Sequence, residues 1–312
     1  MIYRYFLDSL DQSWKDVVMA TVEPVTEEDM EDAVLGTVQA TDPRSQQVMT
    51  SMIRHLHAFV RDVEPTEGEL NSAIDWLTRV GQNCDEQRQE FVLFSDVMGI
   101  SMLVDLINHR STSGATESTV LGPFHAEAPE VENGGNITTG DEWEQGKQTF
   151  LHGRVLDGDG QPIAGAKVDF WQTDESGLYD SQMEGLEEAN MRGILTTNEN
   201  GQYWCRTVKP LGYNVPTDGP VGELMRACHR EGHRPAHIHV MITAPGFHTL
   251  VTHIFPSDDE ALDSDATFGV KKSLVTDWNL IEDAQRATQI GISNPFYEVE
   301  FNFVLNRHPE HD

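Results

Sequence analysis

The nine residues RPAHIHVMI, numbered 234–242, decide the fold class of this chain. From Ala236 to Ile242 every second side chain is apolar, whereas His237 and His239 occupy positions between them. Successive side chains of a β-strand point to opposite faces, so the alternation predicts a strand with one apolar face and one histidine face. We therefore expect the apolar face to pack against a core and both imidazoles to project together from the other face.

Other runs with the same alternation surround this stretch in the second half of the chain. Apolar and polar residues alternate over residues 166–171 and again over 297–303. Turn signals punctuate these runs, namely Asp-Gly-Asp-Gly at 157–160 and Asn-Gly at 200–201. Several short strands joined by such turns are typical of a β-sandwich, which we expect from Gln148 onward.

The first part of the chain has a helical periodicity instead. Apolar residues recur at three- and four-residue steps over residues 49–63, which gives one apolar helix face. Thr66 and Glu69 have the spacing of a capping box that opens a second helix, which is expected to end at Gly81. A third helix is expected over 86–108; because it is apolar on more than one face, it should be buried at an interface.

Between these two parts, residues 111–147 are rich in Gly, Thr, Ser, Pro and Glu and show no periodicity, which predicts a long connecting loop. The sequence therefore predicts an α+β fold. A helical N-terminal domain over residues 1–118 is followed by an all-β sandwich domain over residues 119–312.

The charge of the chain excludes some classes of partner. The formal net charge is −31 over 312 residues, although the apolar content of 38% and the charged content of 23% are ordinary for a folded protein. Nucleic acids and anionic membrane surfaces attract Lys and Arg, so neither is expected as a partner. A heavily solvated acidic surface explains the charge most simply.

Cysteine usage and the apolar runs predict a cytoplasmic protein. Cys84, Cys205 and Cys228 are too few and too scattered for a disulfide framework, which favours a reducing compartment. The apolar run Met1–Leu7 is too short for a signal peptide and meets Asp8 at once. No stretch approaches the roughly 18 apolar residues of a membrane span.

His237 and His239 lie two residues apart on one strand face and could chelate a single metal ion, although such a pair can also be two ordinary surface or core histidines. Tyr179 and Tyr213 both lie in stretches rich in turn residues, where a tyrosine most often anchors a loop. A hard Fe(III) ion prefers anionic oxygen donors and would hold both phenols ionised. Two phenolates and two imidazoles would leave the Fe(III) centre with a net charge near +1. They would also leave room on the ion for a diol that binds through both oxygens.

The order of three motifs resembles the signature of the intradiol ring-cleavage dioxygenases. These motifs are Gly-Leu-Tyr at 177–179, Gly-Tyr at 212–213 and Arg-Pro-Ala-His-Ile-His at 234–239. The resemblance covers nearly the whole chain. It implies one Fe(III) per subunit, with Tyr179, Tyr213, His237 and His239 as ligands. It also implies that Tyr213 leaves the iron when substrate arrives and acts as a base, and that Arg234 stabilises negative charge on the bound ring.

Within the family, four segments resemble the hydroxyquinol-cleaving branch more than the catechol-cleaving branch: residues 94–97, 117–125, 252–255 and 263–271. His253 occupies a position where many catechol-cleaving relatives carry Gln, and Thr267 stands where an apolar residue, commonly Val, is expected. The resemblance implies a substrate pocket lined by Leu93, Asp96, Leu121, Gly122, Pro123, Phe124, Val215, Pro216, Arg234, His253 and Thr267.

The expected reaction is cleavage of hydroxyquinol by O2 between its vicinal hydroxyl-bearing carbons. The product would be 3-hydroxy-cis,cis-muconate or its keto form, maleylacetate. The resemblance also implies a homodimer through the N-terminal helices, with a phospholipid as a further expected ligand at that interface.

Alternatives stay open at this point. Catechol could be the substrate, which would give cis,cis-muconate. Residues 153–168 also resemble transthyretin-like sandwiches, most of which bind or scaffold, so a non-enzymatic binding module is a rival. A cupin is another, but residues 241–246 lack the Glu that would follow its His-x-His pair.

Overall fold

The computed structural model describes residues 25–85, 88–110, 114–174, 176–183 and 189–308, so the predictions made for Met1–Leu7 lie outside the described residues. Contacts divide the chain into two compact units, one up to Asp75 and one from Trp76 onward. The division of the chain at residues 118 and 119 that the sequence suggested stays a prediction.

The first unit contains α3 (Met30–Leu35), α4 (Pro43–Val63) and the beginning of α5 (Glu67–Gln82). Asp42 caps α4, because its carboxylate accepts the backbone N–H groups of Arg44 and Ser45. The capping box that opens α5 is confirmed: the Thr66 hydroxyl accepts from the Glu69 N–H at 3.3 Å, and the Glu69 carboxylate accepts from the Thr66 N–H at 2.7 Å. The apolar side chains along α4 are largely exposed: Val48, Met49, Met52, Leu56, Phe59, Val60 and Val63.

The prediction of a single third helix over 86–108 was wrong. Two helices occupy this stretch, α6 (Glu90–Val97) and α7 (Ile100–Asn108). Gly99 separates them with φ of +69°, a left-handed conformation that an α-helix cannot contain and that glycine adopts without strain. Met102 of α7 is buried, but its other apolar side chains are about half exposed in the single chain: Ile100, Leu103, Val104, Leu106 and Ile107.

The connecting segment is also more ordered than predicted. Instead of a loop throughout, it includes α8 (Gly140–Gln145). Asp141 and Glu142 lie in its first turn, where their negative charges interact favourably with the positive end of the helix dipole and stabilise the helix. A six-residue helix has too little periodicity to be recognised from sequence.

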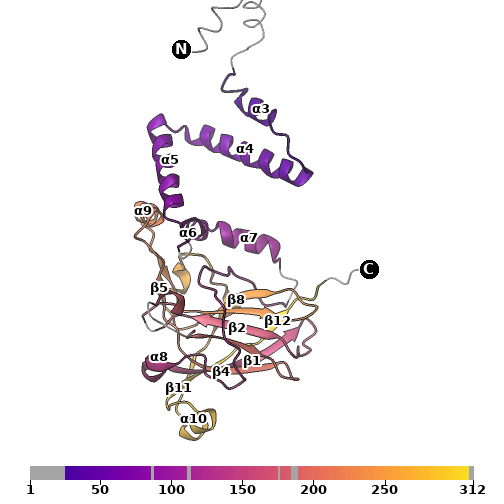
Figure 1. The fold of residues 1–312 in the computed structure, drawn as a ribbon, viewed down its shortest axis with the longest axis vertical. Helices are drawn as coiled ribbons and strands as arrows, with labels where there is room; N and C mark the ends of the chain where they lie inside the picture. Colours follow the sequence, from indigo (N-terminus) through magenta and orange to yellow (C-terminus); the bar gives the residue numbers. More distant parts are fainter. Residues whose placement is uncertain (1–24, 86–87, 111–113, 175, 184–188, 309–312) are drawn as a thin grey trace, which may run out of the picture. The chain divides into compact units, whose positions relative to one another are not determined.

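The second unit is built around a β-sandwich, as predicted (Figure 1). In the described residues one five-stranded sheet contains β10 (Asn279–Ile281), β11 (Phe296–Glu300), β1 (Gln148–Asp157), β12 (Phe303–Leu305) and β4 (Gln202–Val208). The other contains β3 (Arg192–Thr196), β2 (Lys167–Gln172), β7 (Ile238–Thr243), β8 (Leu250–Pro256) and β9 (Val275–Thr276). The run 297–303 is therefore divided between β11 and β12. The turn at 200–201 joins β3 to β4, which belong to different sheets.

The core lies between the two sheets. Ile238, Val240 and Ile242 of β7 are fully buried there, together with Leu151 and Val155 of β1. Burial at about 25 cal/mol per Å2 of apolar surface makes this contact the main source of the unit's stability. The predicted alternation of the strand over 236–242 is confirmed, since its apolar residues face this core.

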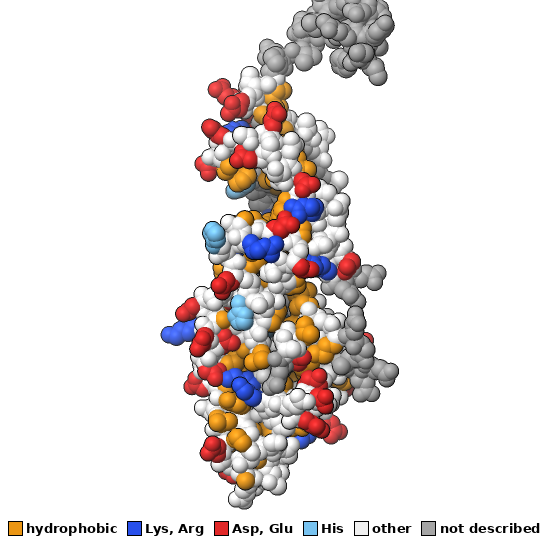
Figure 2. Space-filling view, turned by 90° about the vertical axis from the view of Figure 1, so that its left-hand side faces the viewer, with side chains coloured by type: hydrophobic (Ala, Val, Ile, Leu, Met, Phe, Trp, Pro, Cys, Tyr) orange, Lys and Arg blue, Asp and Glu red, His pale blue; other side chains and the backbone are white. Residues whose placement is uncertain are grey.

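A two-stranded ribbon, β5 (Tyr213–Asn214) with β6 (His233–Arg234), stands apart from both sheets and is joined by α9 (Pro220–Ala227). The remaining helix, α10 (Ala284–Ile290), follows β10. None of the described helices has an apolar stretch long enough to span a bilayer. Figure 2 shows carboxylate side chains scattered over the face in view with fewer Lys and Arg among them, which is the solvated acidic surface that the composition predicts.

Candidate metal and substrate site

The two histidines of the decisive stretch lie on the face of the second sheet that points away from the core. His237 immediately precedes β7 and His239 is its second residue; they are only 2% and 1% exposed. In the register of the sheet, His239 lies opposite Trp171 of β2 and His253 of β8. The His239 ring stacks on Trp171 at a centroid distance of 4.7 Å, so packing fixes its orientation.

Tyr179, in the turn that follows β2, reaches the same point. Its Oη lies 3.2 Å from Nε2 of His237 and 2.9 Å from Nε2 of His239, and the two Nε2 atoms are 3.2 Å apart. Metal–nitrogen bonds of about 2.0–2.1 Å that meet at near right angles place donor atoms about 3 Å apart. The triangle of donors therefore fits a single metal ion.

Hydrogen bonding and burial prepare this triangle for a cation. Nδ1 of His237 lies 2.7 Å from the carbonyl of Pro235, to which it can only donate, so the Nε2 lone pair is free to bind a metal. Burial, reinforced by the nearby Arg234 charge, lowers the pKa of His237 to about 3 and keeps the ring neutral. Burial also raises the pKa of Tyr179 well above its usual range, so its phenol needs a cation beside it to ionise.

The β5–β6 ribbon carries the other two residues of the signature. Tyr213 and Arg234 are direct cross-strand partners. Nη1 of Arg234 donates to Oη of Tyr213 at 3.3 Å and lies 3.4 Å from Nε2 of His237. Arg234 is buried and pairs with Asp265, whose carboxylate accepts from Nε at 3.1 Å. A fixed positive charge thus lies beside the donor triangle.

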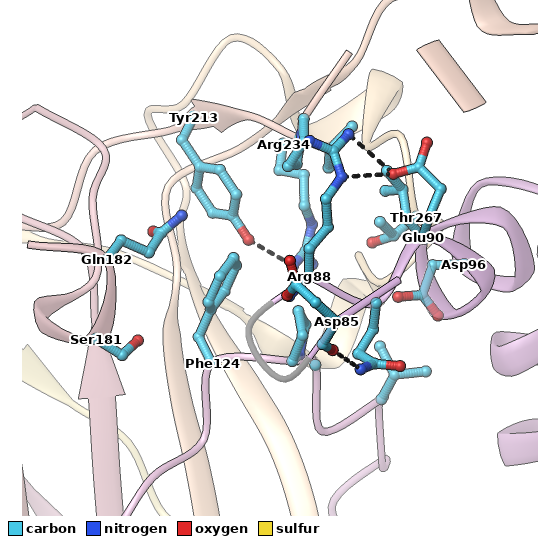
Figure 3. Close-up of a pocket in the computed structure, with 17 residues that line it drawn as sticks. Asp85, Arg88, Glu90, Asp96, Phe124, Ser181, Gln182, Tyr213, Arg234 and Thr267 are labelled. Atoms are coloured by element: carbon cyan, nitrogen blue, oxygen red, sulfur yellow. Dashed lines mark hydrogen bonds and ion pairs between the residues drawn. The ribbon is translucent and has the colours of Figure 1, made fainter. Parts of the chain in front are cut away.

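A cavity of about 490 Å3 opens beside Tyr213 and Arg234 (Figure 3). The structure brings most of the predicted pocket residues to its wall: Leu93, Asp96, Gly122, Pro123, Phe124, Val215, Pro216, Arg234 and Thr267. Tyr213, predicted as an iron ligand, also lines the cavity. Leu121 and His253 do not line it. Leu121 is 40% exposed, whereas His253 is fully buried.

Seven further residues line the cavity that sequence reasoning did not name: Asp85, Arg88, Gln89, Glu90, Val120, Ser181 and Gln182. Val120, Ser181 and Gln182 are close in sequence to residues that were predicted to lie in the site. Their place in the wall could have been predicted from this proximity. No such signal existed for Asp85, Arg88, Gln89 and Glu90. Their place in the wall depends on the packing of α6 against α9, where Glu90 accepts the Val221 N–H at 3.0 Å.

His253 lies beside the donor triangle and does not line the cavity. Its ring centroid lies 4.1 Å from that of His239, and the ligating atoms of His237, His239 and His253 all fall within 4.8 Å. Nδ1 of His253 hydrogen-bonds to the hydroxyl of Thr119, which leaves Nε2 buried without a partner among the described residues. His253 is therefore a neighbour of the donor triangle, with one ring nitrogen already engaged.

The wall beside Tyr179 is held by a buried ion pair. Phe124 stacks on the Tyr179 ring at a centroid distance of 4.5 Å. Arg192, which donates to the carbonyl of Phe124 at 3.3 Å, also pairs with the carboxylate of Asp180 through Nε at 2.7 Å. The Arg192 and Asp180 side chains are 1% and 7% exposed. The pair thus ties the residue after Tyr179 to the strand that carries Arg192.

The chain matches two family models in succession. Residues 42–116 match the model described as "Catechol dioxygenase N terminus", and residues 120–307 match the model described as "Dioxygenase". Together they span most of the chain, the helical part as well as the sandwich.

Individual relatives agree with the family models. The chain is 50% identical to a hydroxyquinol 1,2-dioxygenase of Rhizobium sp. (strain MTP-10005), over 91% of this chain and 96% of that protein. It is 48% identical to a 6-chlorohydroxyquinol 1,2-dioxygenase of Cupriavidus pinatubonensis, over 88% and 95% of the two chains. Among solved structures, hydroxyquinol 1,2-dioxygenase from Pseudomonas putida DLL-E4 superposes with a TM-score of 0.84 at 42% identity and covers 90% of this chain and 99% of its own. Motifs, fold and relatives agree, and this chain belongs to the intradiol ring-cleavage dioxygenase family.

Proposed function

We propose that the chain is a hydroxyquinol 1,2-dioxygenase that holds one Fe(III) per subunit. The observation that supports this best is the convergence of Tyr179 Oη with Nε2 of His237 and of His239, at 2.9–3.2 Å from one another. Tyr213 would be the fourth ligand, because its phenol lies on the same side and shares the Arg234 guanidinium with His237. Phenolate and imidazole donors together suit a hard ferric ion.

Iron bound there would act as a Lewis acid toward both diol oxygens and make the ring reactive toward O2. The chain's own groups supply the rest. Tyr213 is half-buried at the cavity wall, where its phenolate can take a proton from a diol hydroxyl. Arg234 places a fixed positive charge where negative charge develops on the ring. Phe124, Val215 and Pro216 give that ring an apolar wall.

Hydroxyquinol is the proposed substrate, and 3-hydroxy-cis,cis-muconate or its keto form, maleylacetate, is the proposed product. The names of the two relatives near 50% identity support a trihydroxylated ring. Asp96, which is buried beside the cavity, offers a polar partner for a further hydroxyl. Catechol is the competing substrate. A kcat/KM for catechol that equals or exceeds the value for hydroxyquinol would reverse this choice.

The visible absorption spectrum tests the iron, its ligands and diol binding together. A broad tyrosinate-to-Fe(III) band is expected in the purified protein, and it should shift when hydroxyquinol is added without oxygen. A protein that stays colourless after ferric reconstitution would overturn the proposal and return the chain to the class of non-enzymatic sandwiches.

Replacing Tyr213 by Phe is expected to lower kcat by about 100- to 10,000-fold, because the variant loses the proposed base. The visible band should weaken and move, since one of two phenolates is gone. Tyr297→Phe is a matched control: Tyr297 is a half-buried tyrosine of β11 that does not line the cavity. Full activity with unchanged colour in the Tyr213 variant would exclude both proposed roles of this residue.

We further propose that the helical part, residues 1–118, forms a homodimer and that the sandwich, residues 119–312, carries the catalysis in the cytoplasm. The exposed apolar side chains of α4 support the dimer, because isolated proteins rarely leave such a face uncovered. A phospholipid is the proposed additional occupant of that interface. A native mass that corresponds to one chain at micromolar concentration would contradict the dimer.

A further inference from the structure

The turn formed by residues 265–269 lies outside the proposed ligand set, yet it reaches the centre of the site. We propose that Asp265 is a positioning residue that orients Arg234, so that Nη1 of the guanidinium faces Tyr213 and His237, where substrate would bind. This inference rests on the proposed function and deepens it, since it assigns an atom and a supporting residue to the role of Arg234.

The three nitrogen atoms of the Arg234 guanidinium have different surroundings. Nε donates to Oδ1 of Asp265 at 3.1 Å, and Nη1 donates to Oη of Tyr213 at 3.3 Å. Nη2 is buried and has no hydrogen-bond partner among the described residues, so the contact of Nε with Asp265 fixes which way Nη1 points.

The Asp265 carboxylate is itself held by its own turn. It accepts the backbone N–H of Thr267 at 3.1 Å and of Gly269 at 2.8 Å, and the Thr267 hydroxyl donates to it at 3.2 Å. Asp265 is 7% exposed and Arg234 is 4% exposed, so solvent does not compete for the pair. The direction of the Arg234 side chain therefore depends on the shape of this turn.

The turn contains a strained backbone conformation, which indicates that the packing around it imposes its shape. Phe268 has φ of +60°, a conformation that costs a bulky residue energy. At Gly269 a Cβ would come within 3.0 Å of Asp265 Oδ2 and 3.3 Å of Arg234 Nη2. Glycine at position 269 thus leaves room for both the Asp265 carboxylate and the Arg234 guanidinium, and Thr267 of the same turn lines the cavity.

A double-mutant cycle on the iron-loaded protein tests the proposal. Asp265→Asn is expected to lower kcat/KM for hydroxyquinol by about 10- to 100-fold, the usual cost of losing a supporting partner. Iron content and the visible band should stay within error of wild type. If Asp265 acts through Arg234, the Asp265→Asn, Arg234→Lys double variant should be no worse than Arg234→Lys alone. Anaerobic hydroxyquinol binding, measured by calorimetry, should show the same lack of additivity.

Asp157→Asn is the matched control. Asp157 is also buried, accepts two backbone N–H groups of its own turn and pairs with Arg307, but it does not line the cavity. It should leave activity and binding unchanged. If Asp265→Asn does not fold, Gly269→Ala replaces it in the cycle. We expect Gly269→Ala to lower kcat/KM by a smaller factor, and to have no effect when Arg234 is already replaced by Lys.

Each result has one meaning. If the losses of kcat/KM in the Asp265→Asn and Arg234→Lys variants multiply in the double variant, Asp265 does not act through Arg234. That result would overturn the positioning role and leave the proposed function intact. Loss of iron in proportion to activity would make Asp265 a structural residue only. A wild-type protein that neither binds nor cleaves hydroxyquinol would overturn the proposed function, and this inference with it.

Discussion

Replacing His237 by Ala is expected to weaken iron binding by about 100-fold or more and to reduce hydroxyquinol cleavage to background. Four-ligand zinc sites bind with about 10–16 kcal/mol, so one ligand corresponds to about 3 kcal/mol. That energy equals roughly two factors of ten in affinity. In this chain the loss also removes one corner of the donor triangle, whose Nε2 lies 3.2 Å from both Tyr179 Oη and His239 Nε2. Iron per chain after dialysis and oxygen uptake with hydroxyquinol measure the two effects.

His152→Ala provides the control for this variant. His152 is a half-buried histidine of β1 that lies 3.0 Å from a Glu298 oxygen and does not line the cavity. Its replacement should leave the iron content unchanged. If the His237 variant instead kept a full iron complement, the proposed ligand set would be wrong, and His253 would become the next ligand to test.

Replacing Arg192 by Met is expected to lower the free energy of unfolding by about 3–5 kcal/mol, because it leaves the buried Asp180 carboxylate without its partner. The loss should also reach the site. Arg192 holds the Phe124 carbonyl, and Asp180 directly follows Tyr179, so the stack of Phe124 on Tyr179 loses support from both sides. Urea unfolding of the protein with and without iron measures the stability, and the visible band reports on Tyr179.

An exposed ion pair supplies the comparison. Arg286, whose side chain is 46% exposed, pairs with Glu298 on β11, and Arg286→Ala should cost less than about 1 kcal/mol. Adding Asp180→Asn to the Arg192→Met variant should restore part of the lost stability, since the uncompensated charge is then gone. A loss below 1 kcal/mol for Arg192→Met would mean that water or another cation reaches Asp180 in solution.

The predictable parts of the fold are those set by neighbours in sequence. The strand over 236–242 follows from strict alternation, and the start of α5 follows from the Thr66–Glu69 capping box. Gly99 shows the limit. A glycine inside an apolar helical stretch is compatible with a continuous helix, and only its left-handed φ in the folded chain divides α6 from α7.

The site shows the same limit. Tyr179, Tyr213, His237 and His239 could be named because motifs of a known family identify them, and not because spacing alone brings them together. Asp265 lies 31 residues after Arg234 and had no pattern to connect it with the guanidinium. Glu90 and its neighbours reach the cavity wall only through the packing of α6. Contacts between distant segments depend on the whole fold, which local patterns do not encode.

The β5–β6 ribbon has a consequence for the segment that it closes. Its pairing sets Tyr213 directly opposite Arg234, and the Val215 N–H continues the ladder by donating to the Gly232 carbonyl at 2.8 Å. The segment from Pro216 to Glu231 leaves and re-enters the ribbon at this one end, so we expect an insertion or deletion within it to leave Tyr213 and Arg234 paired. Such a change would alter the rim of the cavity, where Pro216 lies, while the proposed base and the guanidinium stay in register.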